Sequence, residues 1–272
     1  SDAPLLNFLN FLESHDDFHR YYNRCLMLLG LSGLWILWRA TRIQSWEELG
    51  WVRPTGNIGI LVSGLLIGLA SFTAIAALAL IFDAREFRTD LQSAAWVNHW
   101  INTLGAAVLV GIIEETLFRG MLFGLLKRDM NWRVAALISA IIFASVHFID
   151  QKPAINEITW TSGFTELPKF VHDFSYDPYW PAYYINLILA GLILAGVLQK
   201  TGNIYCSIGI HAGWIIALKT NGFLTHSVNT DALWGENKTI NGWIATPLLV
   251  LMGWYIFSPN DRQSSPSPDT AV

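Results

Sequence analysis

The sequence predicts an all-α fold, a polytopic transmembrane helical bundle with about seven membrane spans plus interfacial helices. Composition is the first reason: 53% of the 272 residues are hydrophobic and only 14% are charged, against about 25% charged in soluble domains. The second is Ile58–Phe82, an uncharged run longer than the ~20 residues that cross the hydrocarbon core. The net charge is −4 and there is no long basic run, so we expect no nucleic-acid partner. The expected partner is the lipid bilayer around the helices.

Three parts follow one another along the chain. In residues 1–24, Leu and Phe recur at helical spacing between polar residues, which predicts an amphipathic segment lying on the membrane surface. Residues 25–258 form the predicted transmembrane domain, with the motifs described below in a core at 100–218. Residues 259–272 are rich in Ser, Pro and Asp and are expected to be disordered.

Further apolar segments in the transmembrane domain give the remaining predicted spans. The first and the last two are short, which also fits shallow or interfacial helices. The predicted segments are Cys25–Trp38, about Trp100–Leu126, Val134–Ile149, Pro181–Leu198, Ile204–Leu218 and Gly242–Phe257.

Two long connections, Asp150–Trp180 and Thr220–Asn241, fall on the same side of a seven-span bundle. The opposite side has short connections that are dense in Lys and Arg, which favours that side as cytoplasmic. We therefore expect an integral protein of a bacterial inner or plasma membrane, with its active site facing outward.

Charged residues interrupt one predicted span, in the stretch GIIEETLFRG at 111–120. A charge near the bilayer centre costs roughly 2.5–3.5 kcal/mol on insertion scales. Glu115 lies four residues before Arg119, the favoured order for a helical ion pair. Glu114 is then free to face a polar cavity as a general acid or base. The alternative interpretation is a salt-bridged lock between helices.

Two further predicted spans carry a histidine, His147 in FASVHF and His211 in GIHAGW. A single histidine in an apolar helix is more often a hydrogen-bonded packing residue than a catalyst. Three spans with ionisable groups, beside an Ile58–Phe82 span with none, indicate one shared polar site.

The order EETLFR, FASVH and GIHAGW resembles the CAAX protease and bacteriocin-processing family, the glutamate-type intramembrane endopeptidases that include the Ras-converting enzymes. Its motifs are EExxxR, FxxxH and a final His followed four residues later by Asn or Asp. The resemblance implies that Glu114 and His147 activate a water and that His211 stabilises the oxyanion. Glu115 and Arg119 match the remaining positions of the first motif, and no cofactor or metal is implied.

This sequence departs from the family pattern at Ile215, which stands where the family often has Asn or Asp. One oxyanion donor is missing from its expected place, and the loss of such a donor can cost ~10²–10³ in rate. Asn186, the indole of Trp214 or a backbone N–H are the candidate replacements.

The sequence thus predicts an intramembrane glutamate endopeptidase that hydrolyses a peptide bond near the C-terminus of membrane-anchored protein substrates. One alternative is a zinc-dependent membrane protease, because Glu114, His147 and His211 also form a plausible ligand set. The other is a non-catalytic membrane scaffold or immunity protein on the same fold, an interpretation that Ile215 favours.

Overall fold

The computed structural model describes Ser32, Arg39 and residues 43–148, 178–236 and 238–258. The predicted surface segment 1–24, the predicted span at 25–38 apart from Ser32, nearly all of the loop at 150–180 and the tail 259–272 lie outside the described residues. Within the described part, helices are found at each of the other predicted spans.

The elements follow the predicted order. The helices are α3 (Ile58–Ile81), α4 (Ser93–Glu114), the π-helical segment η2 (Glu115–Phe123), α5 (Gly124–Asp129), α6 (Trp132–Val146), α8 (Trp180–Thr201), α9 (Tyr205–Leu224) and α10 (Ala245–Phe257). Two single-turn 3₁₀ helices, η1 (Glu47–Leu49) and η3 (Thr239–Asn241), and two short strands, β1 (Arg85–Phe87) and β2 (Thr225–Ser227), complete them.

Among the described residues, three helices are long and apolar enough to cross a membrane: Ile58–Ile81, the continuous 37-residue helix Ser93–Asp129, and Trp180–Thr201. The apolar helices α6 and α10 have only 15 and 13 residues, which at 1.5 Å per residue falls short of a core about 30 Å thick. The prediction of a helical membrane protein is therefore confirmed, whereas that of about seven full spans is not: three helices of the described residues are long enough.

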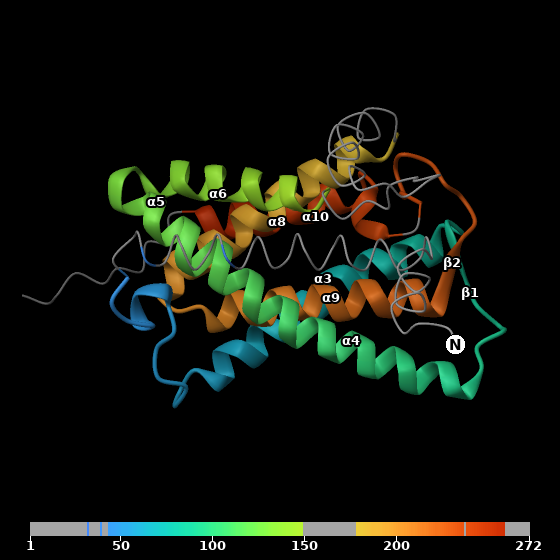
Figure 1. The fold of residues 1–272 in the computed structure, drawn as a ribbon. Helices are drawn as coiled ribbons and strands as arrows, with labels where there is room; N and C mark the ends of the chain where they lie inside the picture. Colours follow the sequence, from blue (N-terminus) through green and yellow to red (C-terminus); the bar gives the residue numbers. More distant parts are fainter. Residues whose placement is uncertain (1–31, 33–38, 40–42, 149–177, 237, 259–272) are drawn as a thin grey trace, which may run out of the picture.

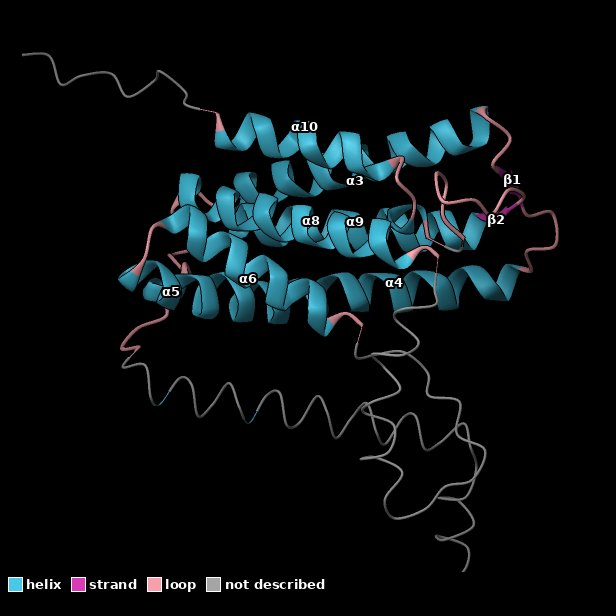
Figure 2. Ribbon diagram, turned by 90° about the horizontal axis from the view of Figure 1, so that it is seen from above, coloured by secondary structure: helices cyan, strands magenta, loops and turns pink. Residues whose placement is uncertain are grey.

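The helices pack in two groups (Figures 1 and 2). Helix α9 lies against α3 and α4, and helix α8 lies against α6 and α10. The segment η2 leaves α4 and contacts α6, so it joins the two groups. A cluster of buried apolar side chains, including Phe72, Phe143, Leu194 and Trp214, fills the space between them.

Helices α3 and α9 approach closely because glycines face each other at their crossing. The four residues are Gly64 and Gly68 on α3 and Gly209 and Gly213 on α9, and a Cβ atom on any of them would overlap the backbone of the facing helix. Small residues spaced four apart allow such contact between helices in membranes. This crossing fixes the position of α9, which carries His211.

The small antiparallel pair β1–β2 corrects the purely helical prediction. It aligns Arg85 with Ser227 and Phe87 with Thr225, and it joins the connection between α3 and α4 to the end of α9 (Figure 1). The predicted loop at 220–241 is therefore wrong at its start, because α9 continues to Leu224 and β2 follows directly. The sidedness of the helix ends in the membrane stays a prediction.

Candidate active site

Glu114 and Glu115 stand where the long helix changes from α-helical to π-helical geometry. Glu114 is the last residue of α4 and Glu115 the first of η2. A π segment widens the turn and is frequent at functional sites. The carbonyl of Phe118, inside this segment, accepts a hydrogen bond from Ser139 Oγ of α6 at 3.0 Å. Periodicity in the sequence carried no signal of this change.

The predicted pair of Glu115 and Arg119 is present and fully buried. Arg119 Nη1 lies 3.0 Å from Glu115 Oε1, and the two side chains are 1% and 0% exposed. The guanidinium carbon lies 4.2 Å from the centre of the Phe143 ring, a distance typical of cation–π contact. Arg119 is therefore held between a carboxylate and an aromatic face.

His211 adds a third partner to this pair, which sequence reasoning missed. Its Nδ1 lies 2.9 Å from Glu115 Oε1, and the side chain is 9% exposed. A carboxylate can only accept a hydrogen bond, so His211 Nδ1 carries a proton and donates it. Glu115 thus lies between two groups able to carry positive charge.

His147 caps α6 and faces Glu114. Its Nδ1 lies 2.8 Å from the carbonyl oxygen of Phe143, so that nitrogen also donates. The FxxxH spacing places this carbonyl one turn before the histidine, which is a signal that could have found the contact. In the neutral ring, Nε2 is then left with a free lone pair.

The two Nε2 atoms converge on Glu114. Oε2 of Glu114 lies 3.8 Å from His147 Nε2 and 3.9 Å from His211 Nε2. Contacts of this length are too long for direct hydrogen bonds and suit a bridging water. The side chains of Glu114 and His147 are each 25% exposed, so this side of the cluster is the accessible one.

Several buried polar atoms in the cluster have no hydrogen-bond partner among the described residues. They are Glu114 Oε2, Glu115 Oε2, Arg119 Nη1 and Arg119 Nη2. The Arg119 Nη1 contact to Glu115 is within ion-pair distance but is not aligned as a hydrogen bond. Unsatisfied buried groups are costly and rare, and four of them are concentrated here.

The structure assigns other partners to two of the residues considered as replacements for the donor missing at Ile215. The Trp214 indole N–H donates to Ser71 Oγ at 2.9 Å. The Asn186 amide donates to the carbonyls of Ile240 and Gly242 at 2.8 and 3.0 Å, and its oxygen accepts from Thr246 Oγ1. Both suggestions were wrong, because these polar groups secure contacts between helices.

The zinc alternative requires three or four metal ligands close together. Within the part of the chain that the structure describes, no three His, Cys, Asp or Glu side chains are grouped so that they could hold a metal ion. The zinc alternative therefore has no preformed ligand set in these residues.

Comparison with known proteins agrees with the resemblance given by the three motifs. A family model described as "Type II CAAX prenyl endopeptidase Rce1-like" matches residues 94–217, which include the whole cluster. No curated protein and no solved structure matches the chain. The similarity of this chain to the Rce1-like family of type II CAAX prenyl endopeptidases therefore covers residues 94–217.

Proposed function

We propose that this protein is an intramembrane endopeptidase that cleaves a peptide bond by direct attack of water. The observation that carries the proposal is the convergence of both histidine Nε2 atoms on Glu114, at 3.8 and 3.9 Å. A water between these groups would be held by one carboxylate and one lone pair. This is the arrangement that general-base activation of water requires.

The partners at Nδ1 support different roles for the two histidines. His147 donates to a neutral carbonyl and stays neutral, so its Nε2 lone pair accepts a hydrogen bond from the water. His211 donates Nδ1–H to the carboxylate of Glu115. In the role proposed for it, the ring carries a proton on both nitrogens, and Nε2–H donates to a developing oxyanion.

The charges of the cluster balance in this assignment. Glu114 and Glu115 contribute two negative charges, and Arg119 and protonated His211 contribute two positive charges. Buried charges persist in an apolar environment when they are paired. A neutral cluster is therefore the state in which these groups are best tolerated inside a helical membrane domain.

The reaction then proceeds in two steps. The water oxygen bonds to the carbonyl carbon while Glu114 takes the proton, and the oxyanion accepts a hydrogen bond from His211 Nε2. The C–N bond then breaks, and Glu114 returns the proton to the leaving amine. Arg119 and Glu115 act as positioning residues, because they hold His211 without reaching the reacting atoms.

Ile215 leaves His211 as the side-chain donor to the oxyanion in this proposal. An oxyanion-hole donor contributes about 10²–10³ in rate. We therefore expect catalysis slower than in a family member with Asn or Asp at that position, unless a backbone N–H of the substrate-bound enzyme supplies the second hydrogen bond.

The proposed substrates are membrane-anchored proteins, cut close to the C-terminus. The family description, a CAAX prenyl endopeptidase, supports this substrate class. The positive charge on the short connections supports an outward-facing site in a bacterial inner or plasma membrane. In that orientation, exported proteins with a C-terminal membrane segment fit better than prenylated proteins of the cytosol.

Glu114→Gln tests the proposal, because it keeps the size of the side chain and removes the base. C-termini of membrane proteins would be compared by mass spectrometry in cells with the wild-type protein and with the variant at matched abundance. We expect a defined set of proteins to keep longer C-termini in the variant, with cleavage slowed about 10²–10⁴-fold. Glu48→Gln is the matched control, since Glu48 pairs with Arg128 near the surface and not with either histidine.

Two other outcomes would contradict the proposal. Identical C-termini with wild type and Glu114→Gln, together with a phenotype on deletion of the protein, would assign the scaffold or immunity role. Loss of cleavage with a chelator, restored by zinc, would assign the zinc mechanism.

A further inference from the structure

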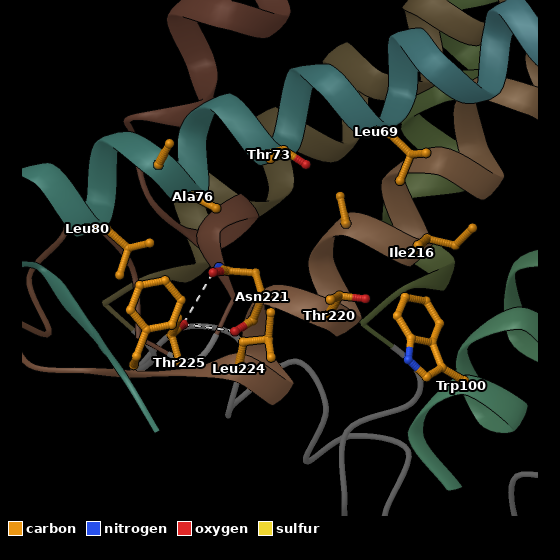
Figure 3. A pocket seen from close by; sticks show the side chains of 13 residues that line it. Leu69, Thr73, Ala76, Leu80, Trp100, Ile216, Thr220, Asn221, Leu224 and Thr225 are labelled. Atoms are coloured by element: carbon orange, nitrogen blue, oxygen red, sulfur yellow. Dashed lines mark hydrogen bonds between the residues drawn. The ribbon is translucent and has the colours of Figure 1, made fainter. Parts of the chain in front are cut away.

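A cavity of about 330 Å³ lies between α3, α4 and α9, on the side of α9 that faces α3 (Figure 3). It begins just beyond the glycine crossing and extends toward the β1–β2 pair. Its walls are almost entirely apolar and include Leu69 and Leu80 of α3, Trp100 of α4 and Ile216 of α9. Neither Glu114 nor either catalytic histidine lines it.

The cavity is open to the apolar surroundings of the helices. Ala77 lines it and is itself exposed. The flanking surfaces of α3 and α4 carry large exposed apolar side chains, such as Ile81 at 71% and Ile101 at 66%. Since both helices are long enough to span a membrane, the medium that meets this opening is lipid.

Two arginines, Arg85 and Arg88, lie near the β1 end of the cavity without lining it. Side chains alternate along a strand, so Arg85 shares a face of β1 with Phe87, which lines the cavity. Glu86 lies on the other face, where it pairs with His226. Arg88 is exposed, and its N–H donates to Leu224 O, so it stands beside the cavity wall.

Among the described residues, no ion pair neutralises the charge of Arg85. Its guanidinium donates to Thr225 Oγ1 at 2.6 Å, to Ser227 Oγ at 2.8 Å and to carbonyls of Thr225 and Glu236, all of which are uncharged. Burial, and then the charge of Arg88, hold the pKa of Arg85 below its ordinary value. An anion at this end would relieve both effects.

We infer that this cavity binds one acyl chain of a membrane phospholipid, with the phosphate near Arg88 at the β1 end. The apolar walls suit an alkyl chain, and the uncompensated positive charge suits the phosphate. A helix from another protein does not fit, because a cylinder 10 Å across fills 330 Å³ with only about 4 Å of its length. The polar side chains at this end, Asn221 and Thr225, lie where the chain would join its headgroup (Figure 3).

Two phenylalanine variants on α3 test the inference on the full chain. Ala77→Phe fills the cavity, whereas Ala74→Phe adds the same side chain to an exposed position on the same helix that does not line it. The affinity for dioleoyl phosphatidylglycerol in mild detergent would be measured by native mass spectrometry. We expect Ala74→Phe to match the wild type and Ala77→Phe to bind at least about tenfold more weakly.

Further measurements distinguish binding of the acyl chain from binding of the headgroup, and both from loss of folding. Arg88 is exposed, so Arg88→Gln leaves the apolar walls intact. This variant should bind phosphatidylglycerol more weakly and dioleoylglycerol as strongly as the wild type does. Equal thermal unfolding of the two phenylalanine variants without added lipid shows that both are folded. Unchanged binding by Ala77→Phe, equal binding of dioleoylglycerol and phosphatidylglycerol by the wild type, or displacement of the phospholipid by equimolar farnesol overturns the inference.

Discussion

Two faces of helix α9 pack against their neighbours in different ways. Gly209 and Gly213 bring its backbone against α3, while His211, between them in the sequence, reaches Glu115 on the other face. On the glycine face the contact is backbone against backbone and contains no charge. On the histidine face, ionisable groups are buried in a cluster in which several polar atoms have no hydrogen-bond partner among the described residues.

The difference indicates that one face of α9 holds the helix in place and that the other carries the ionisable groups. Lipid tails are as apolar as a leucine side chain, so close packing of small residues is what holds helices together in a membrane. Buried ionisable groups are costly there and are kept where they act. The glycine face therefore fixes the position of α9, and in the proposed function the histidine face depends on that position.

The largest effect is expected where the glycine face is broken. In Gly68→Leu, the new side chain would overlap the backbone of Ile210, which cannot give way without moving α9. We expect a loss of stability above about 4–5 kcal/mol, seen as absence of folded protein after extraction and gel filtration. Gly59→Leu is the control, because a Cβ at Gly59 meets open space. Folded, active Gly68→Leu protein would show that the crossing is not the support of the site.

Breaking the charged face is expected to have the next largest effect. Arg119→Gln leaves Glu115 buried without its guanidinium, and the removal of one partner of a buried pair costs about 3–5 kcal/mol. The surface pair of Arg128 and Glu48, at 2.7 Å with 45% and 35% exposure, is the matched comparison. Arg128→Gln should cost at most about 1 kcal/mol. Equal losses in the two variants, measured as free energies of unfolding, would remove the distinction between the buried cluster and a surface pair.

The sequence predicted the two faces unequally. The buried pair of Glu115 and Arg119, and the gathering of His147 and His211 beside Glu114, followed from spacing on helices and from the cost of isolated charges. The contact between His211 Nδ1 and Glu115 did not, because it joins residues 96 positions apart. It depends on how far α9 is displaced along its neighbours, which only the packing determines.

The fold was predictable to a similar extent. Apolar runs located the helices, since hydrophobicity alone is sufficient for that purpose. Their lengths were less accessible: α9 continues through Lys219 to Leu224, although the apolar run ends at Leu218. The β1–β2 pair has three residues in each strand, too few for a pattern of alternation to be recognised.

The smallest effect on stability is expected at a glycine that faces α9 but has room for a larger side chain. Gly111 of α4 also lies against α9, but a Cβ at that position would be 3.6 Å from Ile208 O and 3.7 Å from Ala212 Cβ, which is ordinary van der Waals contact. Because glycine in a helix interior costs about 0.5–1 kcal/mol relative to alanine, Gly111→Ala should be neutral or stabilise the protein by up to that amount. Gly209→Ala makes the same chemical change on the crowded face and should destabilise the protein. Thermal unfolding of the two variants compares them directly, and a destabilised Gly111→Ala would mean that α4 packs as tightly on α9 as α3 does.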